Sequence, residues 1–267
     1  MSFCQIRAIL IDLSGTIHID SKEIVGSIDA LVRLKRSPIR YKFVTNTTKE
    51  SVNSLWNRLK AIGFDLEKSE IFSSLVAARD YLQREKLRPH FLLEDAAKED
   101  FQDLQFDQSS QEAVVVGLAP SKFNYEALNE SFNKLLGGAK LISIHQGRYY
   151  QTGNGLALGP GPFVKALAYA ASVNPDSIPI LGKPNPEFFR AAINSLAIPD
   201  LKPEEVIMIG DDINDDIAGA MAIGMQAVLV KTGKYREGDE EKIDPPPTMI
   251  FSTFAEAIET ILVEMCN

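Results

Sequence analysis

The stretch Ala8-Ile9-Leu10-Ile11-Asp12-Leu13-Ser14-Gly15-Thr16 decides the fold of this chain. An apolar run ends at the carboxylate of Asp12, and a small turn that contains Gly15 follows at once. Such a run is typical of a strand that is buried on both faces of a parallel sheet. We therefore expect Asp12 at the carboxyl end of a strand, where open α/β sheets bind their ligands.

The pattern on either side of this stretch predicts a doubly wound parallel sheet with a Rossmann-like arrangement. Apolar strands and amphipathic helices alternate, with short connections, in the first and the last third of the chain. This alternation is typical of parallel α/β folds. We expect strands over 7–13, 41–44, 206–209 and 227–230, and helices over 27–35 and 254–265.

The middle of the chain differs from its two ends and indicates a second α/β unit inserted into the first. Residues 95–111 are polar and acidic, and residues 153–162 are rich in glycine and proline. We predict a core domain over 1–79 and 179–267, and an inserted α/β domain over 80–178.

The composition narrows the classes of partner. The 267 residues are 45% apolar and 24% charged, with a formal net charge of −8. This charge argues against nucleic acid and against an anionic membrane, because both attract basic surfaces. No run approaches the ~18 apolar residues of a membrane span, and we see no signal-peptide pattern. Cys4 and Cys266 suggest no disulfide framework, so we expect a cytoplasmic protein.

Four side chains lie at or just after the ends of apolar runs: Asp12, Thr45, Lys183 and Asp211. In a parallel sheet these ends converge on one edge, so a nucleophilic carboxylate, a hydroxyl, a cation and a second carboxylate would face one another. Two carboxylates can share Mg²⁺, which prefers oxygen ligands. Lys183 and the metal would neutralise a phosphate group that Thr45 binds, and Asp12 would form an aspartyl-phosphate.

Each of these residues also has an ordinary structural interpretation. An aspartate after a strand is usually a turn former or a helix cap, and Thr45 fits a cap equally well. Lys183, which precedes a proline, fits a solvated loop lysine. The combination of four strand ends in the right chemical order favours the functional interpretation.

The same segments resemble the four ordered motifs of the haloacid dehalogenase superfamily of phosphatases. They are Asp12-Leu13-Ser14-Gly15-Thr16, Val44-Thr45-Asn46, Gly182-Lys183-Pro184 and Gly210-Asp211-Asp212 with Asp216. The resemblance covers almost the whole chain and implies a Rossmann-like core with an inserted α/β cap. It also suggests a homodimer formed through that cap, and a small phosphorylated substrate.

The resemblance implies a role for each matching residue. Asp12 is the nucleophile and a Mg²⁺ ligand, Ser14 is a ligand through its backbone carbonyl, and Asp211 is a third ligand. Lys183 contacts both the phosphate and the nucleophile, and Thr45 and Asn46 bind the phosphate. Asp216 matches a more distant acidic position that supports the metal through water or an outer contact.

Ser14 departs from the common family pattern, which has an aspartate that protonates the leaving group and then activates water. Such help is worth about 10²–10⁴-fold. We therefore expect alkyl phosphate esters to be poor substrates, and pyrophosphate or N-phosphoryl compounds, whose leaving groups depart more easily, to be better ones. His18 is close enough in the chain to be considered as a substitute acid.

Two interpretations of function stay open. The first is a Mg²⁺-dependent phosphohydrolase, which the presence of Asp12, Thr45, Lys183 and Asp211 favours. The alternative is a low-turnover phosphate-binding or regulatory module that retains the fold, which Ser14 favours. A dehalogenase acting on carbon fits less well, because an Asp211 metal site suits phosphate.

Overall fold

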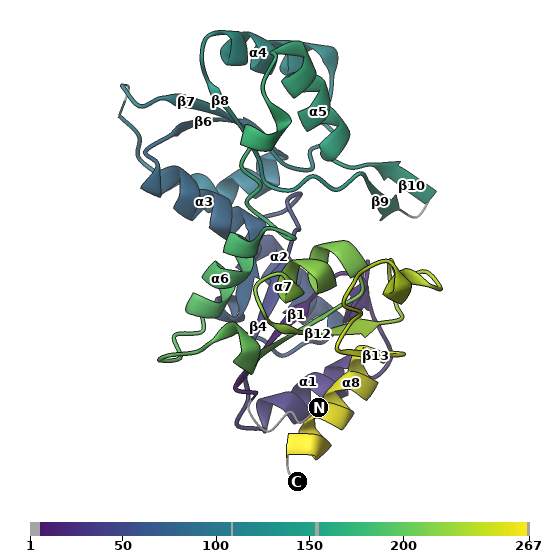
Figure 1. Ribbon diagram of the computed structural model, residues 1–267. Helices are drawn as coiled ribbons and strands as arrows, with labels where there is room; N and C mark the ends of the chain where they lie inside the picture. The colour runs from purple at the N-terminus through teal and green to yellow at the C-terminus, as the bar shows by residue number, and fades with distance from the viewer. Residues whose placement is uncertain (1–5, 108, 153–154, 266–267) are drawn as a thin grey trace. The chain divides into compact units, whose positions relative to one another are not determined.

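The computed structural model describes residues 6–107, 109–152 and 155–265, so that Cys4 and Cys266 lie outside the described residues (Figure 1). The chain divides into two compact units. The first comprises Met1–Thr45, Leu55–Phe72 and Lys183–Asn267, and the second comprises Asn46–Ser54 and Ser73–Gly182. The second unit contains the whole range 80–178 that we expected for the inserted domain. Its assignment as a cap stays a prediction.

The first unit is built on a six-stranded sheet with the order β13-β12-β11-β1-β4-β5. The pairings from β13 through β4 are all parallel, which confirms the predicted α/β fold with a parallel sheet. Its strands are β1 (Ala8–Asp12), β4 (Arg40–Thr45), β5 (Ile71–Ser73), β11 (Val206–Gly210), β12 (Gln226–Val230) and β13 (Met249–Phe251). Every residue of β1 and β11 is buried, as the apolar runs predicted.

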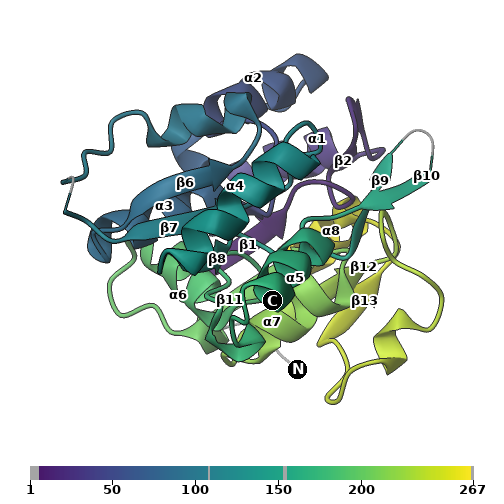
Figure 2. The same ribbon diagram turned by 90° about the horizontal axis from the view of Figure 1, so that it is seen from above.

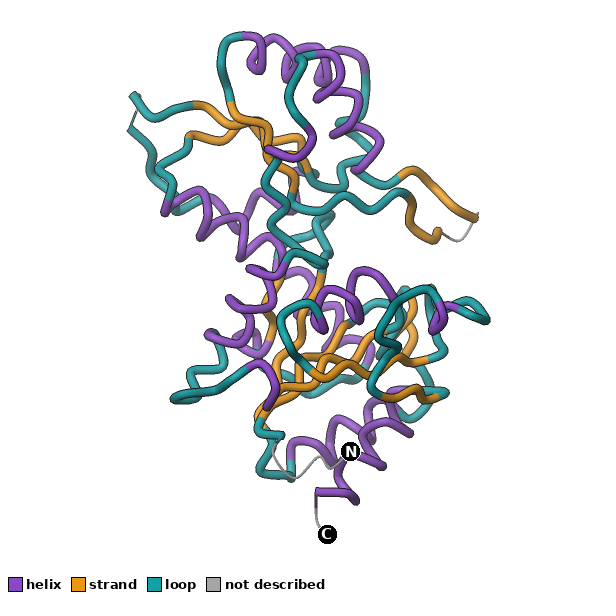
Figure 3. The backbone as a smooth tube through the Cα atoms, in the orientation of Figure 1, coloured by secondary structure: helices purple, strands orange, loops and turns teal. Residues whose placement is uncertain are grey.

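Helices cover both faces of this sheet, as Figures 1 and 3 show. Helices α1 (Ser27–Lys35) and α8 (Phe254–Met265) pack side by side on one face. Helices α6 (Pro186–Asn194) and α7 (Gly219–Met221) lie on the other, together with the π-helix η5 (Ile213–Ala218). Helix α2 (Val52–Ile62) begins among residues of the second unit and continues in the first. A small antiparallel hairpin, β2 (His18–Ile19) with β3 (Lys22–Glu23), follows β1.

The position of β1 in the sheet determines where the candidate site lies. β1 pairs with β4 on one side and with β11 on the other. After β1, β4 is the next strand along the chain that joins this sheet. The chain therefore builds the sheet outward in opposite directions from β1, and ligands of open α/β sheets bind at such a reversal. Asp12, Thr45 and Gly210 are the last residues of these three strands, so their carboxyl ends meet at one edge.

The second unit has its own three-stranded parallel sheet, β6 (Arg88–Leu92), β7 (Glu112–Val116) and β8 (Lys140–Ser143), in that order. Val114 and Val116 face α4 (Tyr125–Leu136) and α5 (Gly161–Ala170), which lie side by side in Figure 2. Ala113 and Val115 face α3 (Ser74–Arg84) and the 3₁₀ segment η2 (Asp95–Phe101). Successive side chains of β7 therefore point to opposite faces of the sheet, and helical segments cover both faces.

The remaining elements are short. An antiparallel hairpin, β9 (Tyr149–Thr152) and β10 (Gly155–Leu158), belongs to the second unit. Single 3₁₀ turns are η1 (Lys68–Glu70), η3 (Pro175–Ser177), η4 (Pro203–Glu205) and η6 (Asp239–Glu241). None of the described helices combines the length and the apolar composition that crossing a bilayer requires.

Candidate active site

A buried lysine joins two carboxylates at the carboxyl edge of the six-stranded sheet. The Nζ atom of Lys183 lies 2.5 Å from Oδ1 of Asp12 and 2.6 Å from Oδ1 of Asp216. It also donates to the backbone carbonyl of Val44, at 3.3 Å, just before the end of β4. The exposed fractions of the three charged residues are 3% for Lys183, 6% for Asp12 and 1% for Asp216. These charges are therefore compensated by one another rather than by water.

Asp211 completes this group from the neighbouring strand. It follows β11 directly and is 1% exposed. The hydroxyl of Thr16 lies 2.9 Å from Oδ1 of Asp211 and 3.3 Å from Oδ2 of Asp12, so one side chain links the ends of β1 and β11. The backbone N–H of Lys234 donates to Oδ2 of Asp211 at 2.7 Å. Both oxygens of Asp211 are thus held in place.

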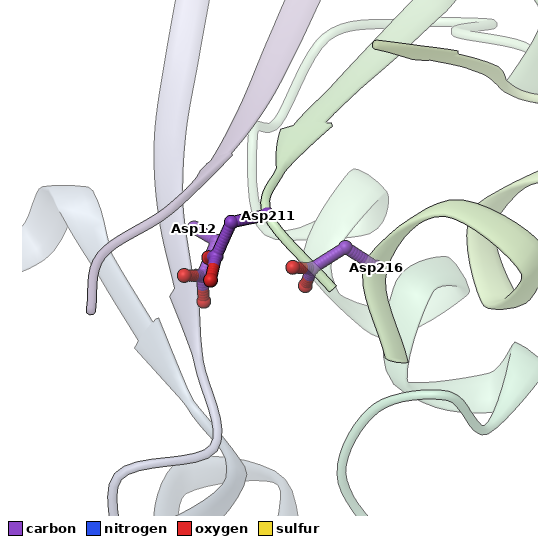
Figure 4. Close-up of side chains that lie close together, drawn as sticks. All are labelled: Asp12, Asp211 and Asp216. Atoms are coloured by element: carbon purple, nitrogen blue, oxygen red, sulfur yellow. The ribbon is translucent and has the colours of Figure 1, made fainter. Parts of the chain in front are cut away.

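The π-helix η5 brings Asp216 to the same place. Asp212 caps its N-terminus by accepting hydrogen bonds from the backbone N–H groups of Asn214 and Asp215. The N–H of Asp212 itself donates to Oδ2 of Asp216 at 3.2 Å. Figure 4 shows Asp216 pointing from its helix toward Asp12 and Asp211, which lie close together. π-Helical turns occur frequently at functional sites.

Burial and neighbouring charges shift the pKa values of three residues in the cluster. Burial raises the pKa of Asp211 to about 7, and the charge of Asp12 adds to this. Burial also raises the pKa of Asp216 well above its usual value, although Lys183 opposes the shift. Burial alone would lower the pKa of Lys183, but Asp12 and Asp216 outweigh it and the pKa rises. Burial therefore favours the neutral form of these two carboxyl groups, while the two carboxylates that contact Lys183 favour its charged form.

The residues present fit a divalent metal ion. Asp12, Asp211 and Asp216 each offer a carboxylate oxygen, and these three atoms lie within 4.8 Å of one another. When ionised, the three carboxylates carry three negative charges and Lys183 carries one positive charge, which leaves a deficit of two. Carboxylate oxygens are the ligands that Mg²⁺ prefers. Both the donor set and the charge deficit therefore suit Mg²⁺.

The other predicted site residues lie at different places. Thr45 is the last residue of β4 and is buried. Asn46 is the first residue of the second unit. Its side-chain oxygen lies so close to Gly182 that a Cβ atom on this glycine would overlap it. Ser14 is exposed in the turn after β1 and forms an isolated β-bridge with His18. The roles predicted for these residues stay predictions.

His18, considered as a substitute acid, is 2% exposed. Its Nδ1 atom lies 3.0 Å from the backbone carbonyl of Asp20.

Three contributions to this cluster were missed or underrated in the sequence. Asp216 was expected to support the metal through water or an outer contact, and its carboxylate lies in the cluster together with those of Asp12 and Asp211. Thr16 was quoted only as part of the turn, yet its hydroxyl joins two carboxylates. Lys234 acts through its backbone N–H, so that its side-chain type gave no signal. A hydroxyl four residues after Asp12, on the same turn, was the one available clue for Thr16.

Family models match both ends of the chain. A model described as haloacid dehalogenase-like hydrolase matches residues 9–107, which include Asp12 and Thr45. A model described as HAD-hydrolase-like matches residues 180–257, which include Lys183, Asp211 and Asp216. Each matched segment carries part of the residue cluster.

Similar proteins extend this likeness over nearly the full length. The chain is 48% identical to haloacid dehalogenase-like hydrolase domain-containing protein 2 from Homo sapiens, covering 98% of each chain. It is 37% identical to phospholysine phosphohistidine inorganic pyrophosphate phosphatase from Rattus norvegicus, covering 97% of this chain and 96% of the relative. The structure of 4-nitrophenylphosphatase from Thermotoga maritima has the same fold, with a TM-score of 0.87 at 23% identity over 97% of this chain and 98% of that one.

Proposed function

The chain belongs to the haloacid dehalogenase-like hydrolases, and from this premise we propose that it is a Mg²⁺-dependent phosphohydrolase that acts through an aspartyl-phosphate on Asp12. Its substrate is a small phosphorylated compound. The observation that carries the proposal is the buried contact of Lys183 with Asp12 and Asp216 beside Asp211. A carboxylate nucleophile, a fixed ammonium and a metal-binding carboxylate set lie together at the edge where such folds bind ligands.

In the first half-reaction, a carboxylate oxygen of Asp12 attacks the phosphorus atom in line with the leaving group. A bond forms between this oxygen and phosphorus, and the bond to the leaving group breaks with its electron pair. Lys183, whose Nζ lies 2.5 Å from Asp12, orients the nucleophile and compensates the charge of the transferred group. Thr45 and Asn46, adjacent in the chain, bind the phosphoryl oxygens.

Asp12, Asp211 and Asp216 would hold the metal. When bound, Mg²⁺ supplies positive charge that neutralises phosphate oxygens. In the same proposal, the backbone carbonyl of Ser14 is a further ligand of the metal. Thr16 keeps the Asp12 and Asp211 carboxylates at a fixed spacing, because its hydroxyl contacts both of them.

In the second half-reaction, water attacks the aspartyl-phosphate, and the phosphorus–oxygen bond to Asp12 breaks to release phosphate. The exposed Ser14 stands where related enzymes have an acid, and its hydroxyl is a weak proton donor and base at neutral pH. Substrates whose leaving groups need no proton from an acid of the enzyme are therefore favoured. Pyrophosphate and phosphoramidates of lysine or histidine meet this condition, and they correspond to the name of the rat relative.

The test is the release of inorganic phosphate from pyrophosphate, phospholysine, phosphohistidine and a simple alkyl phosphate, with Mg²⁺ and with a chelator. We expect metal-dependent release from the first three that Asp12→Asn abolishes. Asp212→Asn is the matched control, because Asp212 caps η5 and is not part of the three-carboxylate cluster. Equal release by wild type and Asp12→Asn would contradict the proposal.

A second candidate function follows from Ser14 itself. Without an acid at this position, the protein would act as a regulatory module that binds a phosphate group and hydrolyses the phosphorylated compound only slowly. Mg²⁺-dependent phosphate binding without phosphate release from any compound in the panel would support this alternative.

A homodimer formed through the second unit, and a cytoplasmic location, complete the proposal of a phosphohydrolase.

A further inference from the structure

The segment that follows β12 reaches back to the carboxylate cluster of the first unit. Besides the backbone N–H of Lys234 on Asp211, the hydroxyl of Thr232 donates to the backbone carbonyl of Gly15 at 2.5 Å. Gly15 lies in the turn between Asp12 and Thr16, so this segment touches both the turn after β1 and the residue after β11. We call Thr232, Gly233 and Lys234 the 232–234 clamp.

The backbone of the clamp packs directly on these two partners. A Cβ on Gly233 would overlap both the Asp211 carboxylate and the Cα atom of Gly15, and a Cβ on Gly15 would overlap the same carboxylate. Both glycines have positive φ angles, +52° and +98°, which disfavour other residues. The two turns therefore pack closely against the Asp211 carboxylate, with no room for a side chain at either glycine.

The clamp is itself held rigid by the residues that follow it. The N–H of Tyr235 donates to the carbonyl of Thr232 at 2.9 Å. The Nη1 atom of Arg236 donates to the carbonyls of Gly233, Lys234 and Tyr235, at 3.3, 3.1 and 2.7 Å. A single guanidinium therefore fixes three consecutive peptide units, which keeps the N–H of Lys234 aimed at Asp211.

From these contacts we propose that the 232–234 clamp positions Asp211 for metal binding, with Thr232 as the residue that fastens it to the turn after Asp12. The inference rests on the proposed function, because it takes Asp211 as a Mg²⁺ ligand. The clamp occupies Oδ2 of Asp211 with a fixed donor and so determines which way Oδ1 points. Groups that orient a metal ligand from outside typically change metal affinity by about 10–100-fold when they are removed.

The experiment is calorimetric titration of Mg²⁺ into the full chain for wild type, Thr232→Val and Thr232→Ser. Valine has nearly the shape of threonine but no hydroxyl, whereas serine keeps the donor to Gly15. The matched control is Thr248→Val, because the hydroxyl of Thr248 accepts a hydrogen bond from the N–H of Ala227 at 3.0 Å, away from the cluster. Thermal unfolding without metal reports whether each variant is folded.

We expect Thr232→Val to weaken Mg²⁺ binding by about 10-fold or more, Thr232→Ser to restore it, and Thr248→Val to leave it unchanged. If folded Thr232→Val binds Mg²⁺ with wild-type affinity, the proposed role of the clamp is overturned, while the proposed function stays intact. Equal weakening in Thr248→Val would overturn it as well, because the effect would then be general. If wild type binds no Mg²⁺, the metal dependence of the proposed function fails, and the clamp fails with it.

Discussion

Lys183 and Asp12 come from segments 171 residues apart in the chain and form a buried ion pair with an N–O distance of 2.5 Å. The same ammonium contacts Asp216. This arrangement makes Lys183 the sole buried cation among three carboxylates in the described part of the cluster. Its removal would leave those charges with neither water nor an ammonium partner.

We therefore predict that Lys183→Met destabilises the metal-free protein by about 3–5 kcal/mol, as breaking a buried ion pair typically does. Chemical denaturation in the presence of a chelator measures this loss. Lys42→Met is the matched control, since Lys42 is half-buried and donates to the neutral carbonyl of Ser195 at 2.7 Å. A loss no larger than that of the control would show that Lys183 does not compensate the carboxylates.

The pKa of Asp211 gives a second prediction, on the stability of the metal-free protein. Burial, with the charge of Asp12, raises this pKa from an ordinary 3.8 to about 7. Between these values the folded protein keeps a proton that the unfolded chain has released. The free energy of unfolding therefore falls as the pH rises from about 4 to about 7, by the order of 2–4 kcal/mol.

Denaturation midpoints across this pH range in a chelating buffer measure the effect. Asp211→Asn removes this titrating group and should make the fall between pH 4 and 7 smaller, while Asp216, whose pKa burial also raises, still contributes to it. A wild-type profile that rises through the same interval would contradict the raised pKa.

Metal addition should stabilise the protein through the three-carboxylate cluster. A ligand that binds only the folded state at 100 times its dissociation constant adds about 2.7 kcal/mol. We predict that Mg²⁺ raises the unfolding temperature of wild type and that Asp216→Asn reduces this rise. Asp212→Asn should keep most of it, because an asparagine retains the side-chain oxygen that caps η5. Equal shifts of the unfolding temperature in both variants would show that Asp216 is not a ligand of the metal.

Ser14 gives a prediction on substrate choice. The side chain is exposed, so a larger residue fits without disturbing the core. We predict that Ser14→Asp raises the hydrolysis of alkyl phosphate esters by about 10²–10⁴-fold, because it supplies a general acid and base. Ser14→Asn, which has the same shape without the acid, should bring no gain. Unchanged ester hydrolysis in Ser14→Asp would count against this explanation of the substrate preference.

The sequence predicted the long elements best. The expected helices over 27–35 and 254–265 have those bounds as α1 and α8, because each has a continuous apolar face and clear ends. The three-residue strands β5 and β13 were missed, since so short a run has no measurable period. Helix α5 was missed because its first turn lies in a segment rich in glycine and proline, although proline is well tolerated there.

The candidate site was predictable where side-chain type and strand position coincide. Asp12 and Asp211 stand at the ends of the apolar runs that form β1 and β11, so their convergence follows from a parallel sheet. Lys183 was expected at the end of a further strand, but the run 178–181 before it forms no strand of the six-stranded sheet and has only an isolated bridge between Ile180 and Ser143. Asp216 was placed near the metal by the family resemblance alone, because it lies in a π-helix whose wider turn departs from the helical period expected there. Lys234 contributes a backbone N–H, which any residue except proline would supply.

The measurement that tests the central claim most directly is the identification of the phosphorylated residue. Wild type is mixed with pyrophosphate and Mg²⁺, quenched in acid during turnover, and digested for mass spectrometry, with Asp12→Asn treated in parallel. We predict a phosphoryl group on the peptide that contains Asp12, and none in the variant. Metal-dependent phosphate release that continues in Asp12→Asn, with no phosphoryl group on that peptide in wild type, would contradict the assignment of Asp12 as the nucleophile.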